Sequence, residues 1–457
     1  MSTLHRALLL SLTATFITIF SPSGVTFAGW KAGVARVKIT PQTSLWMAGY
    51  AGRKKPSEGV AQDLFAKALA VEDDKGARLV IVTTDLIGIP RTLRDWLEGE
   101  LQLKYKLPRE GLLMNASHTH CGPELRMSRL ADDNRPTELQ KDGQTYVDDL
   151  KQRLLAVVGQ AIDRLAPAQL DCFHGRAGFA MNRRRPTENG YTNSPFSDGP
   201  VDHDVPVLRV TDAEKKTKAL LFTYACHNTT LSFFQFCGDY AGYAQEYLEA
   251  DMPGVTAMFL TGCGGDQNPY PRGKIEQAQQ HGRALANGVL AALDSVSKSV
   301  PGPLVAKFDE VALDFAPPPN REELMLLSEG KTDTRASHAR RLLKQLAETG
   351  KIRETYTYPI QVIDWGNNLI MVALAGETVV DYSLRFKREL PSHTVWVAGY
   401  SNDVFGYVPS LRVLQEGGYE AGGAMYYGSL PGPFAPSVED KIARKVLEMA
   451  KPQGTAR

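Results

Sequence analysis

Two histidines one residue apart, His118 and His120, are the first residues in this chain whose spacing suggests chemistry. They follow an apolar run, residues 111–114, that predicts a short buried strand. Gly122 and Pro123 end regular structure soon after, so both histidines are expected on a turn at the carboxyl end of that strand. Ligands collect at this edge of open α/β sheets, and two neutral imidazoles close in sequence suit a metal ion. An ordinary surface loop with two exposed histidines is the alternative.

Other predicted strands also end in polar side chains of types that bind metals. The strand ends carry, in chain order, His118, His227, Asp266, Glu377 and a segment that leads to Tyr407. Because strand ends in an α/β fold meet at one edge of the sheet, these side chains are expected to converge. Two histidines, a carboxylate and a phenol could hold Zn²⁺ with one position open for water. Alternatively, Glu377 is a carboxylate at a helix amino terminus and His227 is a hydrogen-bonded core histidine.

The strands and helices expected from the sequence indicate an α/β fold. We predict a single large mixed sheet with flanking helices and a metal site at the carboxyl ends of its strands. The periodicity of apolar residues predicts helices over residues 146–165, 275–296 and 438–449. Residues 166–210 are expected to be loop-rich, and residues 301–319 are a possible internal seam. After the seam, residues 321–346 predict a charged helical insertion at the surface.

The composition allows a large core and indicates no strongly charged partner. Of 457 residues, 43% are hydrophobic and 23% are charged, with a net charge of +1. The length suits one large α/β domain or two ordinary ones. Without a basic run, nothing indicates nucleic acid or an anionic membrane as a partner. The five cysteines include no Cys-x-x-Cys pair, which argues against a disulfide-dense scaffold or a zinc finger, although one pair could close.

The first 28 residues have the layout of a secretory signal. His5 and Arg6 precede an apolar stretch, residues 7–20, and Ala28 ends the short segment that follows. We therefore expect a signal peptide at residues 1–28 and a secreted or periplasmic protein, with an uncleaved anchor as the alternative. No later segment has 18 unbroken apolar residues, so no transmembrane span is expected in the mature chain.

A series of short motifs resembles, in family order, the neutral/alkaline non-lysosomal ceramidase family. The motifs are Gly49-Tyr50-Ala51, Ala116-Ser117-His118-Thr119-His120 with Gly122-Pro123, Asn182-Arg183, His227, Gly242-Tyr243-Ala244, Gly265-Asp266, Gly376-Glu377-Thr378, Tyr407 and Tyr419-Glu420. They extend over about residues 34–427. The resemblance implies that residues 29–457 form a ceramidase-like zinc hydrolase domain, equivalent to the N-terminal catalytic domain of the family.

The resemblance also implies roles for particular residues in a zinc-dependent amidase. The implied zinc ligands are His118, His227, Glu377 and Tyr407. The residues implied to surround the scissile amide or to contact the substrate are His120, Arg183, Tyr419, Asn182 and Asn268. The implied substrate is a ceramide-like lipid amide, and a peripheral contact with a membrane is compatible with it.

The expected mechanism follows from the chemistry of zinc. Zn²⁺ lowers the pKa of a bound water to about 7 and so supplies hydroxide to attack the amide carbonyl. Tyr419 and His120 would stabilise the oxyanion, each hydrogen bond contributing roughly 3 kcal/mol. Arg183 would orient a polar group of the substrate through its forked donors. Asp266, the remaining residue of the predicted catalytic set, either fixes a histidine tautomer or caps its own loop.

The chain departs from the family pattern in two places. The family has a serine where this chain has Asn268, and an amide side chain cannot serve as an acyl-accepting nucleophile. The chain also ends soon after residue 449, so the C-terminal β-domain of the family is expected to be absent. These departures keep two alternatives open: a zinc esterase or other acyl hydrolase for a small polar substrate, and a non-enzymatic secreted protein on the same scaffold.

Overall fold

The structure, a computed structural model, describes residues 29–126, 136–330, 334–366, 369–428 and 430–451. The predicted signal peptide, residues 1–28, lies outside these residues. Strands and helices form a mixed α/β fold with a large mixed sheet and flanking helices, so the predicted fold class is confirmed. Within the described residues, no helix is long and apolar enough to cross a membrane.

The larger sheet has nine strands and mixes parallel with antiparallel pairing. Its main path runs in the order β12 (Thr256–Thr261), β10 (Thr217–Tyr224), β9 (Asp204–Asp212), β6 (Ala166–Arg176), β1 (Trp30–Lys38), β3 (Phe65–Asp73), β4 (Arg78–Thr84) and β5 (Leu112–Ala116), with β14 (Lys298–Ser299) beside β6. β10 pairs in parallel with β12, and β4 with β5. Within these two parallel pairs, β5 leads into the segment that carries His118 and β10 into the segment that carries His227, two of the four predicted metal ligands.

A second sheet of four strands lies against the first. It contains β15 (Val305–Asp314), β16 (Thr355–Asp364), β17 (Leu369–Leu374) and β19 (Thr394–Ala398). Its first strand begins within residues 301–319, the stretch predicted as a seam. Leu69 and Ile81 of the large sheet share one buried apolar cluster with Met371 and Trp396 of the small sheet. The two sheets therefore pack face to face over a common core.

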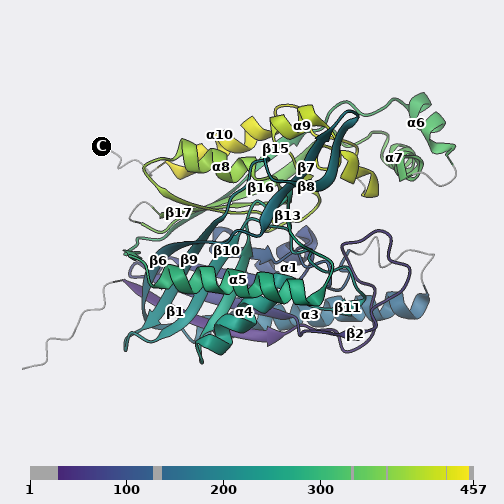
Figure 1. Ribbon diagram of the computed structural model, residues 1–457. Helices are drawn as coiled ribbons and strands as arrows, with labels where there is room; N and C mark the ends of the chain where they lie inside the picture. The colour runs from purple at the N-terminus through teal and green to yellow at the C-terminus, as the bar shows by residue number, and fades with distance from the viewer. Residues whose placement is uncertain (1–28, 127–135, 331–333, 367–368, 429, 452–457) are drawn as a thin grey trace, which may run out of the picture.

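Helices cover the outer faces of both sheets (Figure 1). The large sheet carries α1 (Arg91–Tyr105), α3 (Thr137–Asp163), α4 (Asp239–Asp251) and α5 (Ile275–Leu293), and the small sheet carries α8 (Asp381–Glu389) and α10 (Val438–Ala450). Alternation along β4 accounts for this layering: Val80 and Val82 pack towards the helices, whereas Leu79 and Ile81 face the other sheet. The result is four layers, helix–sheet–sheet–helix.

One stretch of the observed elements differs from the predictions, and the structure answers the open question about disulfides. Residues 166–210, expected to be loop-rich, contain β6, β7 (Ala180–Thr187), β8 (Gly190–Phe196) and most of β9. β7 and β8 form a hairpin in which β8 is largely exposed and the buried half of β7 carries polar side chains, so no apolar alternation marked either strand in the sequence. All five cysteines are buried and free, so none of them forms the disulfide that the sequence left open.

Candidate active site

The candidate site lies where strand ends from both sheets meet. The large sheet supplies His118 just after β5 and His227 just after β10. The small sheet supplies the segments that follow β17 and β19, and these form a two-stranded parallel pair, β18 (Glu377–Thr378) with β20 (Tyr407–Val408). Glu377 and Tyr407 are direct partners in that pair. The four predicted zinc ligands are thus brought together from four separate parts of the chain.

Backbone carbonyls fix the orientation of two histidine rings. His118 Nδ1 lies 2.6 Å from the carbonyl oxygen of Ile87, and His227 Nδ1 lies 2.6 Å from that of Gly264. A carbonyl oxygen only accepts, so each Nδ1 carries the proton and each Nε2 presents a lone pair to the centre of the site. His118 also has a φ of 59°, a left-handed backbone conformation that is unusual for residues other than glycine. A proton on Nδ1 that is donated to a backbone carbonyl, with Nε2 free, is the arrangement typical of metal-ligating histidines.

The four candidate ligand atoms have the spacing of a metal coordination shell. Glu377 Oε2 lies 3.2 Å from His118 Nε2 and 3.2 Å from His227 Nε2. Tyr407 Oη lies 3.2 Å from His227 Nε2. Tetrahedral zinc with ligands at about 2.0–2.1 Å places neighbouring ligand atoms roughly 3.3 Å apart. The donor set therefore fits an ion of this kind.

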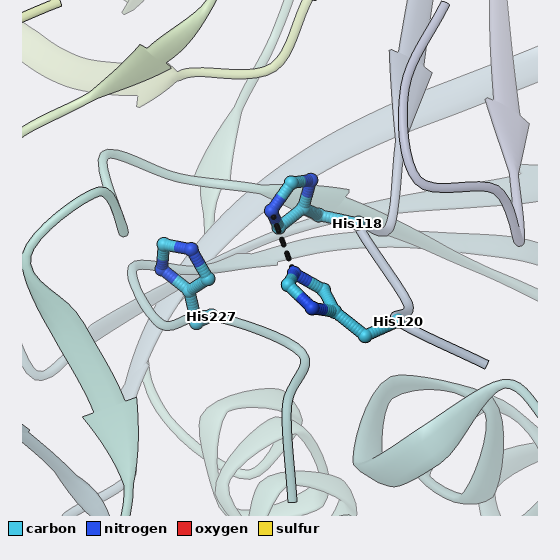
Figure 2. Close-up of side chains that lie close together, drawn as sticks. All are labelled: His118, His120 and His227. Carbon is cyan, nitrogen blue, oxygen red and sulfur yellow. Dashed lines mark hydrogen bonds between the residues drawn. The ribbon is translucent and has the colours of Figure 1, made fainter. Parts of the chain in front are cut away.

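His120 lies beside this group. Its Nε2 is 3.1 Å from His118 Nε2, and Figure 2 shows its ring turned towards those of His118 and His227. One nitrogen from each of these three histidines lies within 4.8 Å of the others, so His120 is also close enough to serve as a ligand. Among the described residues, its buried Nδ1 has no hydrogen-bond partner. A buried polar atom normally has a hydrogen-bond partner, so this nitrogen has the capacity to bind a further group.

The electrostatics of the site keep His120 and His227 neutral and Glu377 ionised. Burial lowers the pKa of His227 to about 4, and the positive charge of Arg183 acts in the same direction. Burial also lowers the pKa of His120 well below its usual value. Burial alone would raise the pKa of Glu377, but His118 and His227 outweigh it and hold that pKa well below the usual range. Neutral imidazoles beside a carboxylate are the protonation states that a metal requires of its ligands.

Arg183, on β7, connects the ligand group to the predicted substrate residues. Its Nη2 donates to Tyr407 Oη at 2.9 Å, and its Nη1 donates to Asn268 Oδ1 at 3.2 Å. Its Nε donates to Glu420 Oε1 at 2.8 Å. Burial would lower the pKa of Arg183, but Tyr407 and Glu420 raise it well above its usual value, so the guanidinium stays charged. A fixed cation therefore lies one hydrogen bond away from the candidate metal ligands.

Tyr419 lies on the solvent side of the same group. Its ring packs edge-on against Tyr407, with centroids 5.4 Å apart, and 42% of the residue is exposed. Partial burial raises the pKa of Tyr419 to about 12, so the phenol keeps its proton at neutral pH. It can donate a hydrogen bond to a molecule that enters from solvent.

Asp266 and Asn182 anchor loops and do not contact the histidines directly. Asp266 Oδ1 accepts from the backbone N–H of Val380 at 2.9 Å, and its Oδ2 accepts from Asn182 Nδ2 at 3.1 Å. Asn182 also donates to the carbonyl of Pro200. Since the histidine Nδ1 protons go to backbone carbonyls, these bonds favour the loop-capping role of Asp266 over the tautomer-fixing one. Both residues hold β7 against the segment that carries Glu377.

Three residues of the site carried no assigned role in the sequence analysis. The ring centroid of Tyr400 lies 4.5 Å from that of His118, and its hydroxyl lies 3.4 Å from His227 Nδ1. Glu420 bridges two buried arginines, Arg183 and Arg184. Tyr400 lies in the segment that leads to Tyr407 and Glu420 adjoins Tyr419 in its motif, so position along the chain was the available signal for both. Arg184 gave no signal beyond its place in a run of arginines.

Comparison with known proteins gives a consistent set of relatives. The family model described as neutral/alkaline non-lysosomal ceramidase, N-terminal, matches residues 30–310. A neutral ceramidase of Drosophila melanogaster is 26% identical over 271 residues, which are 56% of this chain and 38% of that protein. A neutral ceramidase of Drosophila pseudoobscura pseudoobscura is 27% identical over 264 residues, 54% of this chain and 37% of that protein. The alignments thus span less than half the length of these curated relatives.

Two solved structures share the fold. The crystal structure of neutral ceramidase from Pseudomonas aeruginosa superimposes with a TM-score of 0.72 at 20% identity, covering 93% of this chain and 74% of that one. A structure described as ceramidase complexed with C2 gives a TM-score of 0.71 at 18% identity, covering 94% and 77%. At these identities the likeness establishes the fold.

Proposed function

Because the chain belongs to the neutral/alkaline non-lysosomal ceramidase family, we propose that it hydrolyses the amide bond of a ceramide-like lipid with the help of zinc. The observation that carries the proposal is the convergence of His118, His227, Glu377 and Tyr407, with Glu377 Oε2 3.2 Å from both histidine Nε2 atoms and Tyr407 Oη 3.2 Å from His227 Nε2. Two imidazoles, a carboxylate and a phenol favour zinc over magnesium or calcium, which prefer sites made of oxygen atoms alone.

The four ligand residues would hold the ion, with His120 beside it. When bound, zinc supplies Lewis acidity, which polarises a carbonyl and activates water for attack near neutral pH. The carbonyl bonds at the Nδ1 atoms of His118 and His227 keep the ligand rings oriented. Burial raises the pKa of Tyr407 well above its usual value and the Arg183 cation acts against that rise, so with the ion bound the 2.9 Å hydrogen bond from Arg183 would offset part of the negative charge on Tyr407 Oη.

The remaining residues would handle the substrate and its protons. His120 is neutral at neutral pH, so it can accept a proton at a ring nitrogen and return it to the leaving amine. Tyr419 keeps its proton and can donate to the carbonyl oxygen as negative charge develops there, a contribution of roughly 3 kcal/mol. Asn268 Oδ1 accepts from Arg183, so its role is to hold the guanidinium towards the substrate. Neither step requires a serine nucleophile.

The proposal is tested by metal content and substrate choice, measured on the same purified protein. We expect one zinc ion per chain, measured by elemental mass spectrometry, and cleavage of a short-chain fluorescent ceramide. His118→Ala should lose both the zinc and the activity. His281→Ala is the matched control, because this buried histidine also bonds a backbone carbonyl, that of Pro271, yet lies on α5.

Other outcomes would change the proposal in defined ways. Zinc without ceramide cleavage, but with cleavage of the matching ester, would favour an acyl hydrolase of different specificity. Zinc content that His118→Ala leaves unchanged would refute the metal assignment. A purified chain that binds no zinc and cleaves neither substrate would favour a non-enzymatic protein on this scaffold.

A further inference from the structure

Glu420 is a buried carboxylate that the proposed mechanism does not use. It is 3% exposed and follows Tyr419, a residue assigned to the substrate. Burial would raise the pKa of Glu420, but the charges of Arg183 and Arg184 outweigh it and lower that pKa, so the carboxylate is ionised at neutral pH. A buried charge is costly unless it is paired, so the role of Glu420 depends on these two arginines.

The two oxygen atoms of Glu420 are divided between two arginines of β7. Oε1 accepts from Arg183 Nε at 2.8 Å, and Oε2 accepts from Arg184 Nη1 at 2.6 Å. Arg184 is itself fixed, because its Nη2 donates to the carbonyl of Gly417 at 2.7 Å and its Nε donates to Glu416 Oε2 at 3.1 Å. The carboxylate is therefore held at one oxygen by Arg184 and holds Arg183 with the other.

The guanidinium of Arg183 keeps donors to spare after these contacts. A guanidinium has five N–H donors. Within the described residues, Nε donates to Glu420, Nη1 donates once to Asn268, and Nη2 donates once to Tyr407. One N–H on each terminal nitrogen therefore remains for a substrate group, and its direction depends on how the planar group is held. Of the three acceptors, Glu420 carries a full negative charge, so it supplies the strongest bond.

We propose that Glu420 is a positioning residue, which holds the guanidinium of Arg183 with its two remaining N–H donors available to the substrate. The inference rests on the proposed function, in which Arg183 orients a polar group of the substrate. Arg184 acts one step further away, because it keeps Glu420 in place. The competing role for Glu420 is purely structural, the neutralisation of two buried cations.

Glu416 provides a matched control, because its carboxylate belongs to the same network but bonds Arg184 and Arg412 and not Arg183. We expect Glu420→Gln to lower kcat/KM for a short-chain ceramide by roughly 10- to 100-fold, since a small displacement of a substrate-orienting group can cost that much. Glu416→Gln, an equal change in size and charge, should stay within about threefold of the wild type. Zinc content should stay near the wild-type value in both variants, because no candidate ligand is changed.

Chemical rescue separates the positioning role from the structural one. Arg183→Ala leaves the acceptor groups of Glu420, Asn268 and Tyr407 in place, so added guanidinium chloride should bind between them and restore part of the lost activity. In Arg183→Ala/Glu420→Gln, the guanidinium concentration that gives half of the effect should rise by about tenfold or more, because a charge-assisted hydrogen bond is lost. In Arg183→Ala/Glu416→Gln it should change by less than about threefold. Sodium chloride at equal concentration controls for ionic strength.

The same binding is measured without substrate, as a rise in Tm at roughly 1–50 mM guanidinium chloride, which is far below denaturing concentrations. Equal binding by the two double variants, no binding by a folded Arg183→Ala, or equal activity losses in Glu420→Gln and Glu416→Gln would overturn the proposal. If Arg183→Ala does not fold, the two single variants decide between the roles. A rise in Tm that depends on Glu420, in a protein that hydrolyses no ceramide, would support the role of Glu420 and refute the proposed function.

Discussion

At the scale of single residues, the ring of His120 occupies the space that a side chain at position 49 would need. A Cβ added to Gly49 would lie 2.5 Å from His120 Cγ and 2.6 Å from its Nδ1. Gly49 also has a φ of +96°, a conformation that other residues rarely adopt. Tyr50 then packs its ring 4.7 Å from that of His120. The glycine-rich loop therefore determines where His120 lies.

We predict that Gly49→Ala lowers kcat/KM for a short-chain ceramide by roughly 100-fold, because displacing a catalytic group by about 1 Å can cost that much. Zinc content should stay near the wild-type value, since the loop does not contact His118 or His227 in the ligand group. Steady-state kinetics and metal analysis on the same sample measure both quantities.

The matched control is Gly76→Ala. Gly76 has a similarly positive φ, +82°, but open space where its Cβ would lie. This variant reports backbone strain without the collision, and its kcat/KM should remain within about threefold of the wild type. Equal activity losses in the two variants would show that strain alone, and not the position of His120, limits the reaction.

The sequence predicted where the candidate ligands lie but not which contacts their neighbours make. His118, His227, Glu377 and Tyr407 follow recognisable strand ends or motifs, and the structure brings them together. The two roles left open for Asp266 could not be separated from sequence, since its partner Val380 is 114 residues away. Contacts of this kind depend on how distant loops pack, and no local pattern of residues encodes that packing.

At the scale of secondary-structure elements, a charged cluster fastens α8 to the large sheet. Lys387 of α8 donates to Asp202 at 2.8 Å and to Asp204, the first residue of β9, at 3.0 Å. His174 of β6 lies 3.0 Å from Asp204 through its Nδ1. The hydrogen bond with Asp204 raises the pKa of His174 to about 9. The cluster therefore joins α8, which covers the small sheet, to β6 and β9 of the large sheet.

This raised pKa predicts a stability difference that depends on pH. A histidine whose pKa is higher in the folded state stabilises the fold fully below its unfolded pKa, about 6.5, and loses that contribution as pH rises past the folded value. We expect His174→Gln to lower Tm relative to the wild type at pH 6, and the difference to disappear by about pH 10. Thermal unfolding followed by circular dichroism across this range measures it.

A double-mutant cycle isolates the pair. In an Asp204→Asn background, His174→Gln should change Tm equally at all these pH values, because the carboxylate that raises the pKa is gone. A pH-dependent difference that persists in this background would show that another group holds the proton on His174.

Apolar runs in the sequence identified several of the buried strands. The main error, the loop predicted over residues 166–210, arose where such runs are absent. β4, β5, β10 and β12 are buried on both faces and appear as continuous apolar stretches in the sequence. β7 buries the polar side chains of Asn182, Arg183 and Arg184, and β8 is largely exposed, so neither strand shows an apolar pattern in the sequence. The burial of apolar side chains, more than strand propensity, made a strand recognisable in the sequence.

At the scale of the whole molecule, the candidate metal site joins the two sheets. Two ligand residues follow strands of the large sheet, and two follow strands of the small sheet. Asn115 at the end of β5 makes a further link, because its amide donates to the carbonyl of Gly399 and accepts from the N–H of Thr261. An ion held by all four ligands would connect the two halves of the sandwich.

Removing the metal should therefore lower global stability and not only activity. With free zinc at 1,000 times its Kd, binding adds about 4 kcal/mol to the free energy of unfolding, and a chelator should remove that amount. Denaturant unfolding with and without chelator measures the difference. His118→Ala should show almost no effect of chelator. An equal effect in both proteins would mean that the chelated metal binds elsewhere.

Because the four candidate ligands are spread along the chain, they become available one after another during synthesis. His227 and Tyr407 are 180 residues apart, so at roughly 5–20 residues per second the histidine leaves the ribosome some 10–40 s before the tyrosine. During that interval the first sheet can form with its imidazoles already in place but without the carboxylate and the phenol. An ion that bound at that stage would find only two of the four candidate ligands, so we expect tight binding only after Tyr407 has been synthesised.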